Sequence, residues 1–402
     1  STLMRSSAAS DVYKRQIASV FALLAAYFWF SGKVENFKFF KVIPPLIIAY
    51  IIFILCSHFG LWSYAENSPI LDTKQAMMDY GVPLLIFTAV VQSDARKMLK
   101  LGPKLLTVYV LTCVSIILGM VVSAVVFASK LNIPEMGATM GAVTGSFIGG
   151  PENLYAVANV MNLSDGGLSN ALLLIYVVFT PWMTMLIVLL PIIAKSFNRW
   201  TKADTTAIEE AAGRIDDSTK VLGATSAKDI FVILGIGMTL EAVSLLIGEK
   251  VEALIPSLSQ SITMYLIVTV VSLLIGTYTK LGENPALPGI SGTLAFVMLL
   301  LGCVGIDLGV FKDAGYFLAT SATALLIHAV FMVIAAKIFK VDLFTLGCAS
   351  IATIGGNSSA PVVATAYGNK AYITIAVVMA AIGPVIGTFT GLFVGRLIDF
   401  LV

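Results

Sequence analysis

Charged residues are scarce in this sequence, and so are the motifs that build catalytic sites. Lys, Arg, Asp and Glu make up 12% of the 402 residues, about half the share found in soluble globular proteins. The formal net charge of +2 gives no strongly basic surface for nucleic acid. We find no His-Glu-x-x-His, P-loop or Gly-x-Ser-x-Gly motif, which argues against an enzyme and against an ATP-driven pump.

Cysteine and histidine are too few and too dispersed to predict a metal centre. The two histidines, His58 and His328, lie alone in or beside apolar runs, so we interpret them as packed core residues rather than ligands. The cysteines also lie far apart inside apolar runs, and we expect four free thiols: Cys56, Cys113, Cys303 and Cys348. No organic cofactor is predicted.

Long apolar runs, in contrast, are abundant. Hydrophobic residues make up 58% of the chain and lie in runs of roughly 14 to 28 residues separated by short polar loops, which is typical of helices that cross a bilayer. We therefore predict an all-α polytopic membrane protein. Six such segments can be counted in each half: 17–30, 41–59, 77–92, 103–128, 136–161 and 167–194, then 229–247, 261–279, 286–305, 314–336, 343–367 and 371–395.

One long hydrophilic loop, Lys195–Lys228, separates the two halves. We predict a first membrane repeat at 17–194, a cytoplasmic linker at 195–228 and a second membrane repeat at 229–402. The preceding segment, 1–16, contains Ala9–Gln16, which resembles translated sequencing-adaptor sequence. This N-terminal segment is therefore a candidate artefact, and we assign it no functional role.

Two of the apolar segments, 136–161 and 343–367, carry the same interruption. Gly149-Gly150 in the first corresponds to Gly355-Gly356 in the second, at an offset of 206 residues. In both segments the glycine pair breaks the apolar run and is followed by polar residues. A pair of glycine-broken, polar-tipped segments, one in each half, is the best sequence indication of a transporter's binding site.

The distribution of Lys and Arg indicates how these segments lie in the membrane. Loops 94–104 and 195–228 are rich in both residues, and the positive-inside rule places both loops in the cytoplasm. They share a side only if 136–161 enters the membrane and returns as a re-entrant hairpin. About five transmembrane helices and one hairpin per half then give two inverted repeats, with the hairpins meeting near the midplane. A broken helix that crosses would give parallel repeats instead.

The candidate site combines freed backbone groups with uncharged oxygens and one acid. Irregular backbone at membrane depth must be buried or line a cavity; its carbonyls can hold Na⁺, and N–H groups at a half-helix N-terminus can hold a carboxylate. The predicted substrate- and ion-binding residues are Thr144, Ser146, Gly149, Gly150, Glu152, Asn153, Ser350, Thr353, Gly355, Gly356, Asn357, Ser358 and Ser359. Within this set, Na⁺ is expected at Glu152, Asn153, Asn357 and Ser358.

Each of these signals also has a structural explanation. Glu152 is an ionisable side chain in a membrane segment, which by default indicates function, but it could instead lie in water at the hairpin mouth. The glycine pairs could serve only close helix packing. We interpret Glu241 as mainly structural, and Asp94 and Asp307, which follow equivalent segments, as helix caps or loop anchors.

The motifs around the glycine pairs resemble the DUF819, or YjcL-like, family of bacterial membrane proteins. The stretches that carry the resemblance are Ser93–Arg96, Gly145–Ala158, Ala349–Gly356 and Gly383–Gly395. The resemblance implies kinship with Na⁺/bile-acid and Na⁺/glutamate symporters, citrate carriers and cation/proton antiporters. It further implies a panel domain and a core domain with elevator-like or rocking movement, and it is compatible with a homodimer. Pro151-Glu152 departs from the family pattern, which tends to have a small uncharged residue there.

The sequence thus predicts a secondary active transporter in the bacterial cytoplasmic membrane, with lipid and a small-molecule solute as its partners. We expect Na⁺- or H⁺-coupled symport of a small organic anion or an amino acid by alternating access. The alternative is a cation/proton antiporter, for which only Glu152-Asn153 approximates the expected acidic pair. A membrane sensor or channel is less favoured because no signalling domain is attached, and no catalytic residue is predicted.

Overall fold

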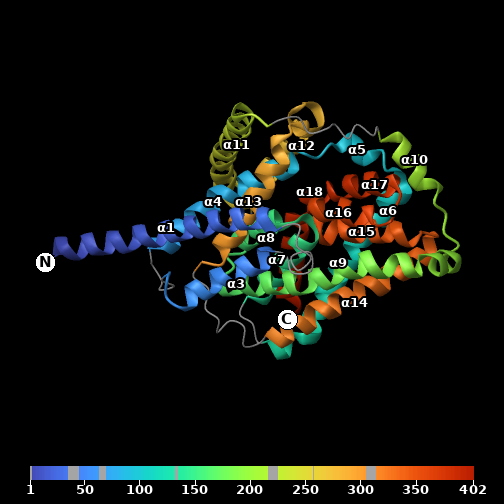
Figure 1. Ribbon diagram of the computed structural model, residues 1–402, viewed down its shortest axis with the longest axis horizontal. Helices are drawn as coiled ribbons and strands as arrows, with labels where there is room; N and C mark the ends of the chain where they lie inside the picture. Colours follow the sequence, from blue (N-terminus) through green and yellow to red (C-terminus); the bar gives the residue numbers. More distant parts are fainter. Residues whose placement is uncertain are drawn as a thin grey trace.

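The computed structural model describes residues 2–34, 45–62, 69–131, 135–215, 225–256, 258–304 and 314–402, and within these ranges the chain is helical without strands (Figure 1). The first half contains α1 (Thr2–Val34), α3 (Pro45–His58), α4 (Pro69–Val90), α5 (Ala95–Leu99), α6 (Gly102–Leu131), α7 (Met136–Gly149), α8 (Pro151–Val160) and α9 (Asp165–Thr201). The linker contains α10 (Thr206–Arg214). The second half contains α11 (Ala227–Leu254), α12 (Gln260–Tyr278), η1 (Leu281–Glu283), α13 (Ala286–Gly302), α14 (Ala314–Phe339), α15 (Leu343–Ile354), α16 (Gly356–Thr365), α17 (Lys370–Ala380) and α18 (Gly383–Leu401).

Seven of the described helices contain a stretch that is long and apolar enough to cross a membrane: α1, α6, α9, α11, α12, α14 and α18. The predicted polytopic all-α class is confirmed. One predicted segment, 371–395, is wrong as a single helix, because α17 ends at Ala380 and α18 begins at Gly383. Pro384 lies in the first turn of α18, where its missing N–H is tolerated, and proline disfavours helical backbone in the residue before it.

The helices pack in two groups, each drawn from both halves of the chain (Figure 1). The panel group consists of α1, α3, α4, α11, α12 and α13, with α4 packed against the last three of these. The core group consists of α6 to α9 and α14 to α18, in which α6 packs on α14 and α7 packs on α18. The resemblance to the DUF819 family implies a panel and a core of this kind. The long interface between the panel group and the core group is called the seam below.

Both glycine-broken segments fold back as helical hairpins. A Cβ placed on Gly145 would lie 3.1 Å from Cγ2 of Val157, although residues 12 apart in a straight helix are separated by about 18 Å. Helix α8 therefore returns along α7. In the second hairpin, the ring of Phe344 stacks on that of Tyr367 with centroids 4.4 Å apart, so α16 returns along α15. The sequence allowed either a re-entrant hairpin or a broken helix that crosses the membrane at 136–161, and the structure has the hairpin.

The two hairpins enter the protein from opposite ends of α9. The mouth of the first lies at the start of α9, where Oε2 of Glu135 accepts hydrogen bonds from the backbone N and Oγ of Ser164 at 3.1 and 2.7 Å. The mouth of the second lies near the end of α9, where the N–H of Leu343 donates to Oδ1 of Asn198 at 2.9 Å. The 37 residues of α9 span roughly 50 Å. That the complete halves are inverted repeats stays a prediction.

The two loops rich in Lys and Arg lie at the same end of the protein. Nζ of Lys104 contacts Oδ2 of Asp204 at 3.3 Å, and Nε of Arg214 donates to the carbonyl oxygen of Lys100 at 3.1 Å. Hydrogen bonds from Thr206, and then from Lys104, lower the pKa of Asp204 to about 2, so its carboxylate is ionised at any physiological pH. The shared position agrees with the hairpin interpretation, and that this is the cytoplasmic end stays a prediction from the positive-inside rule.

Glycine stripes bring α7 and α18 into backbone contact. A Cβ on Gly141 would lie 2.7 Å from the carbonyl oxygen of Gly391, and a Cβ on Gly387 would lie 2.7 Å from Cα of Gly149. Such contacts leave no room for any side chain. Gly149 therefore serves close helix packing, which is the structural explanation considered for the glycine pairs. The two stripes are Gly137, Gly141, Gly145 and Gly149 on α7, and Gly383, Gly387, Gly391 and Gly395 on α18.

Candidate functional site

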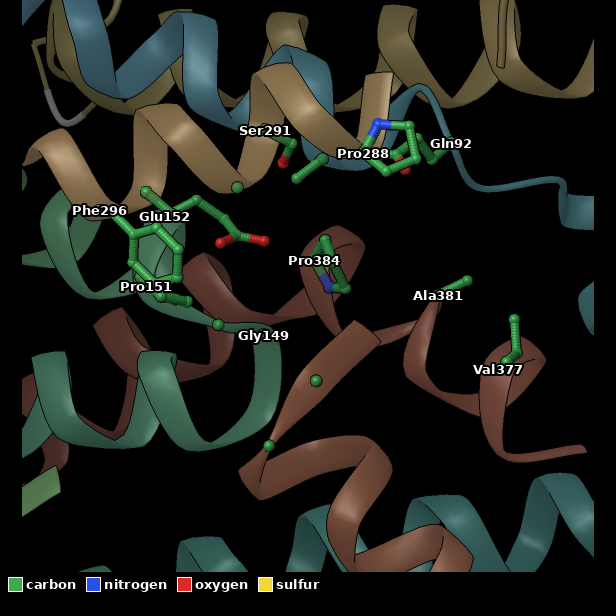
Figure 2. A pocket seen from close by; sticks show the side chains of 16 residues that line it. Gln92, Gly149, Pro151, Glu152, Pro288, Ser291, Phe296, Val377, Ala381 and Pro384 are labelled. Atoms are coloured by element: carbon green, nitrogen blue, oxygen red, sulfur yellow. The ribbon is translucent and has the colours of Figure 1, made fainter. Parts of the chain in front are cut away.

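A cavity of about 430 Å³ lies on the seam between panel and core (Figure 2). Its panel wall comes from α4 and α13, and its core wall from the tips of both hairpins and the α17–α18 junction. The panel residues are Ala89, Gln92, Pro288, Ser291, Gly292, Ala295 and Phe296. The core residues are Gly149, Gly150, Pro151, Glu152, Gly355, Gly356, Val377, Ala381 and Pro384.

Both glycine pairs therefore line one cavity, although they are 206 residues apart in sequence. The returning half-helices α8 and α16 begin at this cavity, at Pro151 and Gly356. Because the hairpins enter from opposite ends, the cavity lies between the two entrances. This is the position at which transporters with broken helices hold their solutes.

The two hairpin tips differ in backbone conformation. Gly150 has φ 103° and ψ 178°, a region that is essentially restricted to glycine. Gly356 has φ 61°, a positive value that asparagine and aspartate adopt more readily than other side-chain-bearing residues. A Cβ on Gly150 would lie 2.9 Å from Oε2 of Glu152, whereas a Cβ on Gly356 would meet no atom of the described residues within 4 Å. The first tip is thus covered by a carboxylate, and the second is open.

Glu152 is the one acid in the described cavity lining. It lies in the first turn of α8, is only 6% exposed, and directs its carboxylate into the cavity (Figure 2). Across the described ranges, no other side chain forms an ion pair or hydrogen bond with it, and its carboxylate accepts from its own backbone N–H. The alternative that Glu152 lies at the hairpin mouth is wrong, because Glu135 and Ser164 occupy that place. Burying a carboxylate without an opposite charge is costly, which favours a bound cation or a proton here.

The predicted hydroxyl ligands of the first helices lie behind the cavity rather than in its lining. Oγ1 of Thr144 donates to the carbonyl oxygen of Met140 at 2.7 Å, and Oγ1 of Thr353 donates to that of Ser350 at 2.8 Å. Both hydroxyls are thus satisfied by their own helices. Ser146 is buried beside the first tip, where its carbonyl oxygen accepts from the N–H of Gly150 at 2.8 Å.

Asn153 supports the first tip from within the protein. Its Oδ1 accepts a hydrogen bond from Oγ1 of Thr388 on α18 at 2.7 Å. Its Nδ2 is buried with no hydrogen-bond partner among the described residues and lies against Gly149. In the second hairpin, Ser359 packs on Gly355. The predicted ligands Asn357 and Ser358 belong to α16, but their side chains lie outside the described part of the structure.

Ser350 belongs to a buried hydrogen-bonded chain that the sequence did not reveal. Oγ of Ser115 donates to the carbonyl oxygen of Thr112 at 2.6 Å, so it accepts from Nδ1 of His328 at 2.7 Å. Nε2 of His328 then accepts from Oγ of Ser350 at 2.9 Å, and this Oγ accepts from Nε1 of Trp182 at 3.0 Å. The chain ties the second hairpin to α6, α9 and α14. His328 is a satisfied core histidine, as predicted, with two serine partners.

We predict that His328→Ala destabilises the protein by roughly 2–4 kcal/mol, because it opens a void and leaves two buried serine hydroxyls without their partner. The measurement is the thermal midpoint of the purified protein in detergent. The matched control is His58→Ala, since His58 is exposed at the end of α3, and its change should stay within about 0.5 kcal/mol. Equal midpoints for the two variants would contradict a structural role for the chain.

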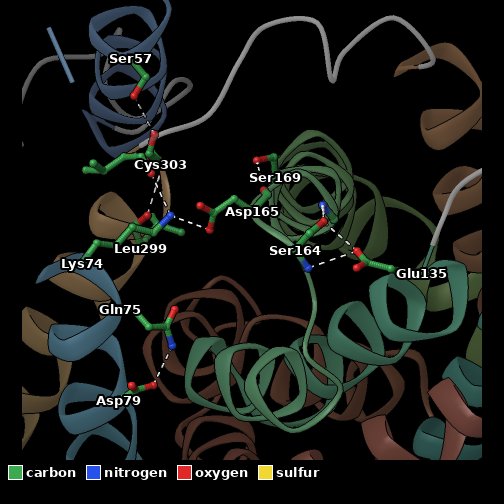
Figure 3. Close-up of polar contacts among 12 residues, drawn as sticks. Ser57, Lys74, Gln75, Asp79, Glu135, Ser164, Asp165, Ser169, Leu299 and Cys303 are labelled. Carbon is green, nitrogen blue, oxygen red and sulfur yellow. Dashed lines mark hydrogen bonds and ion pairs between the residues drawn. The ribbon is translucent and has the colours of Figure 1, made fainter. Parts of the chain in front are cut away.

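A second, polar cavity of about 330 Å³ lies on the same seam, nearer the mouth of the first hairpin. Here Lys74 of α4, only 5% exposed, contacts Oδ1 of Asp165 at 2.7 Å and donates to the carbonyl oxygen of Val304 at 2.8 Å (Figure 3). Nδ2 of Asn159 on α8 donates to Oδ1 of Asp79 on α4 at 3.1 Å. The panel and the core are therefore joined by an ion pair and a hydrogen bond at this end.

The two cavities follow one another along α4 and α8. On α4, Val82 lines the second cavity and Ala89 the first, with the fully buried Leu85 between them. On α8, Glu152 lines the first cavity and Tyr155, three residues later, lines the second. About one helical turn on α8 and about two on α4 thus separate the two spaces.

The other acids noted in the sequence have separate positions. Asp94 caps α5, accepting from the N–H of Arg96 at 2.9 Å, as predicted. Glu241 is buried in α11 of the panel, and its Oε1 has no hydrogen-bond partner within the described residues. Asp307 lies outside those residues. The four cysteines are free thiols, also as predicted.

Comparison with known proteins agrees with a membrane protein. The sequence profile of a family described as "Protein of unknown function (DUF819)" matches residues 18–401. The chain is also 24% identical over 384 residues to the protein named "Uncharacterized membrane protein YjcL" of Bacillus subtilis (strain 168), covering 91% of this chain and 92% of that one. Together with the seven apolar spans, this match identifies a multi-pass integral membrane protein.

Proposed function

The chain belongs to the DUF819 family, as its motifs predicted, and we propose that it is a secondary active transporter in which a cation gradient drives a small solute across the membrane. One observation carries the proposal: two hairpins that enter from opposite ends place their glycine tips in a single cavity on the panel–core seam. Irregular backbone at this depth is tolerated where it lines a water-filled cavity, and paired half-helix ends at such a site can bind both ion and solute.

Glu152 is the proposed binding point of positive charge in the cavity, either the coupling ion, Na⁺ or H⁺, or a cationic group of the solute. Its carboxylate is buried in the cavity wall and has no cationic side chain beside it in the described lining. A cation or a proton would remove the cost of burying that charge. The uncharged oxygen of Gln92, which also lines the cavity, is of the kind that suits a hard cation.

Alternating access would come from movement of the core group against the panel. Such movement must break the contact of Lys74 with Asp165 at one end of the seam, and the hydrogen bond from Oγ of Ser93 to the carbonyl oxygen of Ala381, at 2.8 Å, near the first cavity. The movement must also break the hydrogen bond from Nδ2 of Asn159 to Oδ1 of Asp79. In this proposal the two cavities are the two halves of the solute's route.

The test uses single cysteines in a Cys56→Ser background, each probed from one side with a membrane-impermeant thiol reagent. Ser291→Cys reports on the first cavity and Gln75→Cys on the second, since these residues line them. If the protein is a transporter, replacing Na⁺ by choline should change the labelling rates at the two cysteines in opposite directions, by at least about threefold. A threefold change corresponds to a shift of under about 1 kcal/mol in the equilibrium between the two conformations. Gly213→Cys, at an exposed position of α10, is the control and should not respond.

The same experiment separates a transporter from a channel, because a channel would make both cavities reactive from either side at once. That outcome would refute the proposal. Cation/proton antiport is the second candidate, favoured by the lone carboxylate in the described cavity lining. It would be recognised by cation-driven proton efflux from proteoliposomes that contain no organic solute.

A further inference from the structure

The first hairpin tip presents negative charge to the cavity. The N-terminus of a helix carries a partial positive charge, but at α8 the carboxylate of Glu152 lies in the first turn and close to Gly150. The carboxylate more than offsets the half-charge of the helix end. A ligand group that binds at this tip should therefore be cationic.

The second tip presents the opposite polarity. Helix α16 is 10 residues long and has no acid in its first turn, and its N-cap, Gly355, supplies no side-chain hydrogen bond. The first N–H groups of a helix have no acceptor within it, and they attract anions. The space around Gly356 is open for at least 4 Å where a side chain would begin. A ligand group that binds at this tip should be anionic.

The rest of the described cavity wall adds no net charge. Its panel and core faces are largely apolar, with Ala89, Ala295, Phe296 and Val377 among the lining residues, and the described lining contains no Lys, Arg or His. A simple organic anion would face Glu152 without a basic partner, and a simple amine would leave the second tip unused. A volume of about 430 Å³ accommodates a small solute with its hydration water.

We propose that the solute is a zwitterion of the α-amino acid type, with a small or apolar side chain. Its ammonium group lies at Glu152 and its carboxylate at the first turn of α16. The inference rests on the proposed transport function and narrows its substrate class from organic anions and amino acids to amino acids. The N-termini of α8 and α16 both carry partial positive charge. Because the carboxylate of Glu152 covers the N-terminus of α8, the cavity has one negative tip and one positive tip.

The test measures the thermal midpoint of the purified protein in NaCl with three matched pools of compounds. One pool holds neutral α-amino acids, the second the carboxylic acids that lack the amino group, and the third the amines that lack the carboxyl group. The amino acids should raise the midpoint. The acids and the amines should bind roughly ten- to a hundredfold more weakly, the loss expected for one charge-assisted contact.

Two substitutions test the two tips separately. Glu152→Gln should weaken the response to the amino-acid pool roughly tenfold or more. At the second tip, Gly356→Asn and Gly356→Asp have nearly the same shape and differ in charge. The aspartate should cover the helix end and abolish the response, whereas the asparagine should retain most of it. The midpoint of each variant without solute verifies that it is folded.

The inference is overturned if the acid pool stabilises the protein as well as the amino acids do, if none of the pools stabilises it, or if Glu152→Gln and Gly356→Asp both respond like the unaltered protein. These failures are distinct from failure of the transport proposal. Opposite labelling changes at Ser291→Cys and Gln75→Cys, together with binding of the acid pool, would keep the transporter and reject the zwitterion. Simultaneous labelling of Ser291→Cys and Gln75→Cys from either side, together with binding of the amino-acid pool, would reject the transporter and keep the zwitterionic ligand.

Discussion

Gly391→Ala should destabilise the protein by roughly 2–4 kcal/mol, the range in which added volume in a tightly packed interface becomes costly. The new methyl carbon would lie 2.7 Å from the carbonyl oxygen of Gly141 and 3.0 Å from Cα of Gly145. These are backbone atoms of α7, so no side chain can rotate away and the helices must separate. The first hairpin would then lose its support along α18.

The matched control is Gly235→Ala, because Gly235 lies within the apolar helix α11 and a Cβ there meets no atom within 4 Å. Alanine is a better helix former than glycine, so this change should be neutral or stabilising by up to about 1 kcal/mol. The thermal midpoint and the yield of monodisperse protein should therefore move in opposite directions for the two variants. If both variants gained stability, the close contact between α7 and α18 would be refuted.

Gly150→Asn should reduce transport by at least about tenfold, whereas Gly356→Asn should leave most of it. Asparagine at Gly150 would have to adopt φ 103° and ψ 178°, at a cost of about 1–3 kcal/mol or more. Its Cβ would also displace the carboxylate of Glu152 from the first tip. At Gly356, φ is 61°, a positive value at which asparagine is several-fold enriched, and a Cβ there meets no atom of the described residues within 4 Å.

Two measurements separate folding from function in these variants. The thermal midpoint reports the strain, and the ion-dependent labelling of Ser291→Cys reports the movement. We expect Gly150→Asn to lose the labelling response even where the protein remains folded, because the charge at the first tip has moved. Equal behaviour of the two asparagine variants would mean that the hairpin tips are equivalent, as the sequence motif alone would predict.

Much of the fold could be predicted because membrane helices leave a local signal. The length of an apolar run is set by bilayer thickness, and the Lys and Arg residues of 94–104 and 195–228 mark one side of the membrane. Those two facts were enough to favour a hairpin at 136–161, which the structure has. The boundary inside 371–395 was missed, although Pro384 was a readable signal for it.

The position of the candidate site could be predicted from the sequence, but the side chains that line it could not. The glycine pairs identified the hairpin tips, yet Thr144, Thr353 and Asn153 turned out to face helix backbone or α18 rather than the cavity. Helical periodicity alone does not show which face of a hairpin helix meets its neighbours. The spacing of glycine at every fourth residue in α7 and α18 was a usable signal for their contact.

Local composition and periodicity by themselves determined the membrane class, the approximate helix positions and the two glycine tips, since each of these depends on residues close together in the chain. Tertiary structure alone decided which helices form the panel and the core, that His328 pairs with Ser115 and Ser350, and that Glu152 shares a cavity with the open start of α16. These outcomes depend on contacts between residues more than 200 positions apart, and only close packing of the whole chain selects among such contacts.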